Sequence, residues 1–381
     1  MTNPDNGTNL LHPLAGSSLR HFVRLLWANR SRIESRYARR LVKATGVVAA
    51  ATPLRLWESL RFGTAIRNQE LSDPPVFIVG HWRSGTTNLH RLMLSNSQLA
   101  SVTLLHCAAP HLFLTCGDGI SRYLRKRLPS NRPMDAVSLG TDEPMSEDFG
   151  LIGVTNKTHY GSYLFPQTAE AEFARTILFE PNDAKAKVAE WERDYLWLLK
   201  KITLASSGRR LCLKNPANTG RVPQLLKLFP DAKFVFVKRN PYVVHASTCR
   251  LMERFLERFA LQSSDRDDIE RFVSERYERL MQKWVADRDL IPSENLLELR
   301  HEDIVRDPEA SVASVHRQLD ICGLDDAYPL LQDRISSQAA YENNRYDFEP
   351  NYVDRISPFL APTAQRWGYD APTTPVANRV A

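Results

Sequence analysis

The sequence has no long hydrophobic run and no secretory leader. Its longest mostly apolar stretch, about residues 44–54, is far shorter than the roughly 20 residues that a membrane-spanning helix needs. The N-terminus, MTNPDNGTNL, is polar and has no charged segment followed by an apolar core. These absences argue against an integral membrane protein and against a secreted one, so we expect a cytoplasmic protein.

Cysteine is also scarce, and its spacing excludes two kinds of site. The five cysteines are odd in number and far apart, and no CxxC pair occurs. The pattern therefore predicts neither a zinc site nor a dithiol redox site. Buried thiols in a reducing compartment are what we expect instead.

Excess positive charge is confined to one segment. Eleven Lys and Arg against three Asp and Glu give residues 20–70 a charge of +8, which leaves −2 for the rest of a chain whose total is +6. The bulk of the protein therefore lacks the basic surface of a nucleic-acid-binding protein, and we expect no nucleic acid partner.

The basic segment has the pattern of an amphipathic helix. Phe22, Leu25, Leu26, Trp27 and Tyr37 are interleaved with arginines, and such helices bind anionic membranes. Peripheral membrane contact through this helix is one expectation, and a non-catalytic membrane-surface protein is one alternative function. The other interpretation is a helix that packs on the rest of the protein with its arginines in water.

The chain changes character at Ser72-Asp73-Pro74-Pro75. Before it, helical patterns cover residues 18–48 and 53–67. After it, short apolar runs at 76–79, 211–213, 234–237 and 296–299 read as buried strands, each followed by a loop and a helical pattern. We therefore expect a basic helical extension over residues 1–72 and a catalytic domain over 73–381. Repeated strand–helix units predict an α/β fold, a parallel sheet in a three-layer α/β/α arrangement, with ligands beyond the carboxyl ends of the strands.

The loop Gly80–Thr87, which follows the first predicted strand, has the form of a phosphate cradle. Its glycines let backbone N–H groups face an anion, and the next helix adds its positive end. The motif of P-loop kinases needs a Lys where this chain has Thr86, and no acidic residue is placed like a magnesium ligand. Arg83 supplies the cation instead. A P-loop-type kinase or nucleotide-binding protein stays an alternative, as does a plain strand-to-helix turn.

A second candidate phosphate site follows the strand at 234–237. Arg239 lies at the strand end, and Pro241 opens a helix that carries Ser247 two turns in. One phosphate could reach both side chains. Two phosphate sites at one sheet edge indicate a nucleotide phosphorylated at two positions.

Together these motifs resemble the sulfotransferases that use 3'-phosphoadenosine 5'-phosphosulfate. The RSGTT run at 83–87 and the Arg239, Pro241 and Ser247 segment match in order and strand context, and residues 299–304 resemble the late R-Y-E-D-L segment with His301 in place of Tyr. The resemblance covers about residues 73–370 and is nearest to the large bacterial-type branch, while RSGTT is shared with the tyrosylprotein branch.

The resemblance implies a P-loop-like sulfotransferase fold in which the two loops bind different groups of the donor. The first loop would hold the 5'-phosphosulfate, and the second would hold the 3'-phosphate through Arg239 and Ser247. The first-loop residues are Arg83, Ser84, Gly85, Thr86 and Thr87. The reaction implied is in-line transfer of a sulfuryl group to an acceptor hydroxyl or amine, with no metal expected, because a sulfuryl group carries less negative charge than a phosphoryl group.

Lys214 and a general base complete the expected site. Lys214 ends a predicted strand and resembles the Lys with which the tyrosylprotein branch steadies the transferred group; a surface lysine is the alternative. A base must take the acceptor's proton. Related sequences often have a Glu where this chain reads Thr103 to Cys107, and there His106 is the leading candidate. Its rivals are His111, Glu143 and Glu147.

The acceptor is not indicated by any pattern. Residues 104–165 are expected to face it, and a carbohydrate, a lipid, a small alcohol or a peptide would each fit.

Overall fold

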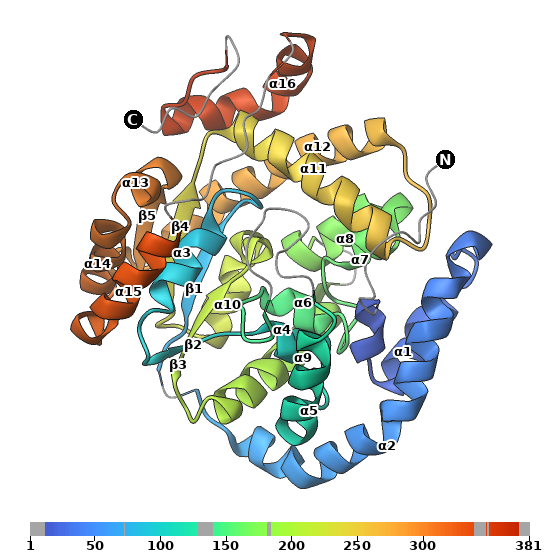
Figure 1. Cartoon of the computed structure of the whole chain (residues 1–381). Helices are drawn as coiled ribbons and strands as arrows, with labels where there is room; N and C mark the ends of the chain where they lie inside the picture. Colours follow the sequence, from blue (N-terminus) through green and yellow to red (C-terminus); the bar gives the residue numbers. More distant parts are fainter. Residues whose placement is uncertain are drawn as a thin grey trace. The chain divides into compact units, whose positions relative to one another are not determined.

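The computed structural model describes residues 12–71, 73–128, 140–180, 184–338, 348 and 350–372. The chain forms two compact units (Figure 1). Unit 1 comprises residues 1–72, 101–208 and 251–266, and unit 2 comprises residues 73–100, 209–250 and 267–381. The N-terminal helices thus share a unit with residues from the middle of the chain. The expected division into an extension of 1–72 and a catalytic domain of 73–381 stays a prediction.

Unit 2 is built on a five-stranded sheet in which every described pair of neighbouring strands is parallel, with the order β2-β3-β1-β4-β5. The strands are β1 (Val76–Gly80), β2 (Leu99–Ala100), β3 (Arg210–Lys214), β4 (Lys233–Lys238) and β5 (Leu296–Arg300). Four of them were predicted. The fifth, β2, is two residues long, too short to give a periodic signal.

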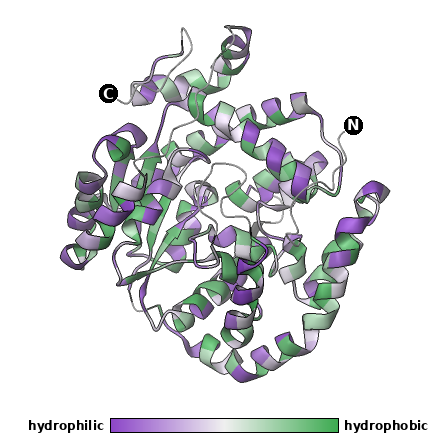
Figure 2. Ribbon diagram, in the orientation of Figure 1, coloured by the Kyte–Doolittle hydropathy of each residue, from purple (hydrophilic) through white to green (hydrophobic). Residues whose placement is uncertain are grey.

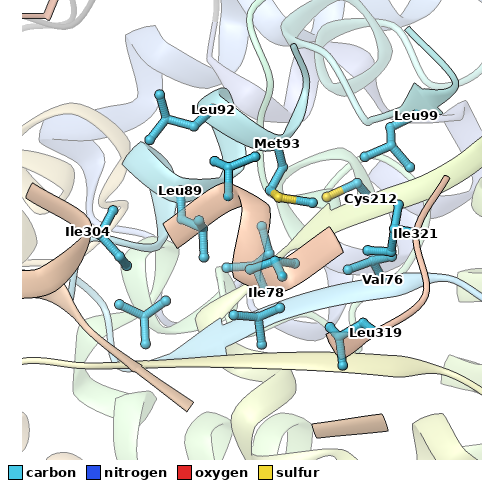
Figure 3. Close-up of a cluster of buried hydrophobic side chains, with 14 of the residues drawn as sticks. Val76, Ile78, Leu89, Leu92, Met93, Leu99, Cys212, Ile304, Leu319 and Ile321 are labelled. Carbon is cyan, nitrogen blue, oxygen red and sulfur yellow. The ribbon is translucent and has the colours of Figure 1, made fainter. Parts of the chain in front are cut away.

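One face of this sheet is covered by helices α3 (Thr86–Met93), α13 (His301–Arg306), α14 (Pro308–Gln318) and α15 (Leu324–Gln338). Figure 3 shows the interface, in which Val76 and Ile78 of β1 meet Leu89, Leu92 and Met93 of α3. Alternate residues of a strand point to the same face, so Val76 and Ile78 belong together here and Phe77 to the other side.

The opposite face is aromatic. Phe236 of β4 stacks on Trp284 of α12 (Arg266–Asp287) at 4.2 Å, and Trp367 of α16 (Pro350–Trp367) meets the same ring edge-on at 5.5 Å. Phe77 contacts Phe229, which follows α10 (Val222–Leu228). Helices therefore cover both faces, and the predicted three-layer α/β/α architecture is confirmed. Three 3₁₀ helices complete the described part of unit 2, namely Pro216–Gly220, Arg288–Leu290 and Ser293–Asn295.

Unit 1 is helical. Its α-helices are α1 (Leu19–Ala28), α2 (Ala38–Asn68), α4 (Leu104–Ala108), α5 (Phe113–Arg125), α6 (Glu147–Leu151), α7 (Gly161–Leu164), α8 (Ala169–Phe173) and α9 (Ala184–Ala205). Short 3₁₀ turns lie at Pro13–Gly16, Ser35–Tyr37 and Pro166–Thr168, and a π-turn at Ala174–Leu178. The division between the units falls within α11 (Pro241–Phe259).

The N-terminal helices begin and end at different places from those predicted. The break lies between α1 and α2 at residues 29–37, and α2 continues through Pro53. Proline removes one backbone donor from a helix interior. In the turn before it, Thr52 Oγ1 and Arg55 Nη1 both donate to the carbonyl of Val48, at 2.7 and 3.1 Å. These donors converge on the carbonyl next to that of Ala49, which is the one that Pro53 leaves without its helical donor.

A buried ion pair ties α2 into unit 1. Glu58 of α2 pairs with Lys201 of α9, and both side chains are almost fully buried. Glu58 Oε2 also accepts the Thr115 N–H of α5 at 2.7 Å, and Lys201 donates to the carbonyl of Pro110 at 2.5 Å. Among the described helices, none combines the length and the apolarity needed to cross a membrane.

Candidate functional site

The loop between β1 and α3 has backbone φ angles that most residue types disfavour. Gly80 and Gly85 have φ values of 140° and 98°, and Arg83, which is not glycine, has a φ of 69°. A Cβ on Gly80 would lie 2.5 Å from the carbonyl oxygen of Val237. A left-handed conformation at a non-glycine residue costs energy and is concentrated at functional sites.

The structure brings Arg83, Arg239 and Ser247 together in unit 2. Arg83 Nε donates to Ser247 Oγ at 2.9 Å, and Arg239 Nη1 donates to the Arg83 carbonyl at 3.0 Å. The three residues come from the loop after β1, the end of β4 and the second turn of α11. They meet because β1 and β4 are adjacent parallel strands whose carboxyl ends share one edge.

The first turn of α3 offers anion-binding groups at the same edge. Gly85 caps the helix and supplies no side-chain acceptor to its first N–H groups. Ser84 is buried, and its hydroxyl has no hydrogen-bond partner among the described residues. Thr86 is buried and Thr87 half-buried beside it. The N–H groups at a helix start, together with hydroxyls, are suited to a phosphate or a phosphosulfate.

His301 packs directly on this loop, which the sequence did not indicate. A Cβ built on Gly85 would overlap His301 Nδ1, and that nitrogen has no hydrogen-bond partner among the described residues. Burial, and then the nearby Arg239 guanidinium, holds the pKa of His301 well below its usual value. The ring is therefore neutral at pH 7. The signal that could have found it is its place directly after β5, at the same sheet edge as the other motifs.

Side chains that follow β3 and β4 in the sequence also contact the loop between β1 and α3. Thr219 Oγ1 donates to the Gly80 carbonyl at 2.9 Å and accepts the Gly80 N–H at 2.8 Å. Thr248, next to Ser247, donates to the Trp82 carbonyl at 3.2 Å, and the buried Arg276 lies 3.5 Å over the Trp82 ring. The first residues of the loop, up to Trp82, are thus held, which helps the strained conformation of the adjacent Arg83 to persist.

Lys214 is a buried lysine. It is 8% exposed at the end of β3, and it pairs in register with Ile78 of β1. Its charge, after burial itself, lowers the pKa of His90 to about 3. The interpretation of Lys214 as a plain surface lysine is therefore wrong, and its role toward a transferred group stays a prediction.

The candidate base His106 lies in unit 1 with one ring nitrogen already engaged. Its Nδ1 accepts the Thr103 N–H at 3.1 Å, in a capping box at the start of α4. Burial, followed by the Lys201 charge, lowers the pKa of His106 to about 4. A neutral ring that accepts at Nδ1 carries its proton on Nε2, so this geometry makes His106 a weak proton acceptor.

The rivals of His106 lie in the same unit. Glu147 is fully buried in the first turn of α6, and Tyr195 donates to its Oε1 at 2.9 Å. His111 Nε2 lies 3.1 Å from the Gly153 carbonyl, and burial lowers the pKa of this imidazole to about 3. Glu143 is half-buried, and its carbonyl accepts the Leu104 N–H.

A buried carboxylate–imidazole pair in unit 1 was missed from the sequence. Asp148 Oδ2 lies 2.5 Å from His159 Nδ1, and it also accepts the Thr158 hydroxyl at 3.1 Å. A carboxylate at Nδ1 favours the tautomer whose lone pair is on Nε2, which is the arrangement of a general base. No periodic pattern links residues eleven apart, so only the fold reveals the pair.

The predicted site residues are thus distributed over both units. Arg83, Arg239, Ser247 and the α3 start belong to unit 2, whereas His106 and Glu147 belong to unit 1. Their catalytic roles remain predictions. In the described part of the chain, no group of three His, Cys, Asp or Glu side chains is arranged to hold a metal ion.

Comparison with known proteins places this geometry in a family. The model of the sulfotransferase family matches residues 74–326. The omega-hydroxy-beta-dihydromenaquinone-9 sulfotransferases of Mycobacterium tuberculosis and Mycobacterium bovis are each 28% identical over 358 residues, which are 94% of this chain and 91% of those proteins.

Two solved structures share the fold. A sulfotransferase of Mycobacterium avium has a TM-score of 0.65 at 17% identity and covers 86% of both chains. A sulfotransferase of Mycobacterium tuberculosis has a TM-score of 0.57 at 17% identity, with 79% of this chain and 85% of that one covered. Since the family model spans more than half of the sequence, the chain belongs to the sulfotransferase family.

Proposed function

We propose that the protein transfers a sulfuryl group from 3'-phosphoadenosine 5'-phosphosulfate to an acceptor hydroxyl or amine. The observation that carries this proposal is the joining of Arg83, Arg239 and Ser247 at the start of α3. Two cations, a hydroxyl and a row of helix N–H groups at one sheet edge complement a nucleotide with anionic groups at two positions.

The donor would be divided between two groups of residues. The N–H groups of Gly85, Thr86 and Thr87, the Ser84 hydroxyl and Arg83 would hold the 5'-phosphosulfate, whereas the Ser84 N–H donates to the His81 carbonyl at 3.2 Å. Arg239 and Ser247 would hold the 3'-phosphate. The buried Ser84 hydroxyl supports this fit, because a buried polar group without a protein partner is costly unless a ligand satisfies it.

Transfer would proceed by in-line displacement. The acceptor oxygen forms a bond to sulfur while the bond from sulfur to the 5'-phosphate oxygen breaks, and 3',5'-bisphosphoadenosine leaves. Arg83 would stabilise the departing oxygen, Lys214 the sulfuryl oxygens, and the fixed N–H groups both. The reaction as proposed needs no metal, and activity that persists in a chelator would separate it from a P-loop kinase reaction.

The proton of the acceptor would pass to a general base. His106 and Glu147 are retained as candidates, and the Asp148–His159 pair is added because its carboxylate favours a basic Nε2. The candidates differ in the tautomer that their neighbours favour. His106→Gln, Glu147→Gln and His159→Gln variants, compared by the acid limb of their kcat/KM profile, would identify the base.

The acceptor that we propose is a hydroxylated lipid. The relatives at 28% identity are named for an omega-hydroxylated dihydromenaquinone, an apolar molecule with a terminal alcohol. An acceptor screen with apolar and water-soluble alcohols, read out by release of 3',5'-bisphosphoadenosine, tests this choice. Faster turnover of the water-soluble set would overturn it.

A nucleotide-binding measurement tests the donor assignment without an acceptor. Wild type is expected to bind 3',5'-bisphosphoadenosine at least about tenfold more tightly than adenosine 5'-phosphate, because buried charge-assisted hydrogen bonds are strong. Ser247→Ala is expected to reduce that ratio, and Arg239→Ala to abolish it. Ser314→Ala, a matched change on α14, should leave it unchanged. A wild-type ratio in both site variants contradicts the two-site proposal.

A further inference from the structure

Exposed hydrophobic side chains are concentrated on the N-terminal helices. Of the eleven large hydrophobic residues that are exposed in the described chain, eight lie between Leu19 and Leu60. In Figure 2, hydrophobic positions recur along α1 and α2 among hydrophilic ones. Such a concentration is unusual for solvated helices, and it marks an interaction surface.

Helix α2 has two opposite faces. Its buried residues, which include Val48 and Ile66, lie on one side of the helix at 3.6 residues per turn. Val42, Trp57 and Leu60 lie on the other side, and they are 69%, 55% and 82% exposed. The second face is therefore a continuous exposed surface and not the fringe of the core.

The charge of that outer face has one sign. Arg39, Lys43, Arg61 and Arg67 are all exposed. Within this fully described helix, Glu58 is the single carboxylate, and it is buried against Lys201. Because Glu58 is buried, the exposed cations near Trp57 and Leu60 have no carboxylate of α2 beside them.

Helix α1 repeats the arrangement. Leu19, Val23 and Trp27 are spaced by four residues, so they lie along one side of the helix, and all three are exposed. Arg20 and Arg24 lie next to this stripe, while Phe22 and Leu25 face the core.

We propose that the outer faces of α1 and α2 dock on the surface of an anionic lipid bilayer. Trp and Leu side chains would enter the boundary between headgroups and acyl chains, and the Arg and Lys stems would extend their charges to the phosphates. Cations near such a surface are attracted to acidic lipids. The helices would lie on the bilayer and not cross it, since among the described helices none is long and apolar enough to span one.

The charge selects the bilayer over a second copy of the chain. A twofold contact through this face would set the same cations opposite one another, and like charges across an interface are costly. An anionic bilayer instead complements both the apolar and the cationic part of the face. The proposal does not rest on the donor chemistry, because docking requires no turnover.

The test is sedimentation of the full-length protein with vesicles. Phosphatidylcholine vesicles are compared with vesicles that contain one third phosphatidylglycerol, at low and at high salt. Wild type is expected to bind the anionic vesicles and to lose much of that binding in salt. Trp57→Ser/Leu60→Ser is expected to weaken binding at least about tenfold, and Arg20→Ser/Arg24→Ser/Arg61→Ser to reduce its salt dependence.

Matched controls separate docking from misfolding. Leu290→Ser/Leu330→Ser changes two exposed leucines of unit 2 and should bind vesicles like wild type. All variants should keep the wild-type unfolding temperature and bisphosphate affinity. Wild-type vesicle binding by Trp57→Ser/Leu60→Ser overturns the proposal. The proposal is also overturned if the wild type binds no vesicles and forms a dimer that Trp57→Ser/Leu60→Ser dissociates. The face would then be a contact between copies of the chain.

Discussion

The two units hold their buried polar groups in different ways. In unit 2, the loop after β1 is fixed by residues that follow neighbouring strands, such as Thr219 after β3 and Ser247 after β4. In unit 1, Glu58 and Lys201 are 143 residues apart and meet only because α2, α5 and α9 pack together. The first arrangement follows from the sheet topology, whereas the second depends on assembly of distant helices. Damage to unit 2 should therefore appear in ligand binding, and damage to unit 1 in stability.

The sharpest test of this contrast removes the loop cations. Arg83→Ala is expected to lower the rate of sulfuryl transfer by about 10²–10³-fold, the usual effect of losing one preorganised group at developing charge. Arg239→Ala is expected to lower transfer at low donor concentration, because it weakens binding of the 3'-phosphate. The unfolding free energy should change little by comparison. Transfer from a radiolabelled donor measures the first quantity and urea unfolding the second. Arg271→Ala, an exposed arginine of α12 paired with Asp268, is the matched control; an equal loss of activity there would refute the assignment.

Breaking the ion pair of unit 1 should give the opposite result. Glu58→Gln is expected to cost about 3–5 kcal/mol of unfolding free energy, because it leaves Lys201 charged and buried. Bisphosphate binding per folded molecule should remain. Replacing both partners with apolar residues, Glu58→Leu/Lys201→Met, should recover much of the loss.

A surface pair gives the control for this prediction. Asp268→Asn breaks an exposed pair with Arg271 and is expected to cost less than about 1 kcal/mol. If Glu58→Gln cost no more than Asp268→Asn in urea unfolding, α2 would not be an integral part of unit 1.

A glycine pair compares the two units directly. Gly85→Ala is expected to cost about 2–4 kcal/mol and to weaken bisphosphate binding, since its φ of 98° disfavours a side chain and the new Cβ would overlap the His301 ring. Gly46→Ala in α2, where nothing lies within 4 Å of the new Cβ, should stabilise by about 0.5–1 kcal/mol. Calorimetry of both variants checks the signs, and a stable Gly85→Ala protein with normal binding would contradict the loop geometry.

The last prediction concerns the loss of stability at acid pH. Burial lowers the pKa of His111 to about 3, below its ordinary value of 6.5, so the unfolded chain holds one more proton between these pH values. The stability from this group is complete above pH 6.5 and is lost as the pH falls toward 3. His111→Gln should therefore reduce the acid slope of the unfolding free energy by about 1.4 kcal/mol per pH unit below 6. Urea unfolding at pH 7, 6 and 5 measures it, and an unchanged slope would show that another group carries the effect.

The sequence predicted the parts of unit 2 that local patterns encode. Apolar runs located four strands, and the positions of Arg83, Arg239 and Ser247 relative to strand ends implied that they meet. The inference holds because the carboxyl ends of parallel strands lie at the same edge of the sheet. His301 was visible only as a departure from a motif, and its contact with Gly85 depends on side-chain packing that no spacing reveals.

Unit 1 was less predictable for a physical reason. Helix α2 continues through Pro53, and on the far side of that proline Arg55 and Glu58 contact Ala15 and Lys201, which are 40 residues earlier and 143 residues later in the chain. The Asp148–His159 pair is likewise formed by folding and not by a motif. Propensity describes single helices, whereas tertiary contacts decide where these ones start and stop.

The separation of Glu58 from Lys201 also bears on how the chain is made. The ribosome adds 143 residues between the two, which at about 5–20 residues per second takes roughly 7–30 s. During that time the inner face of α2 has been synthesised but α9 has not. Helix α2 can therefore reach its final packing only after α9 has been made, so its synthesis and its burial are separated in time.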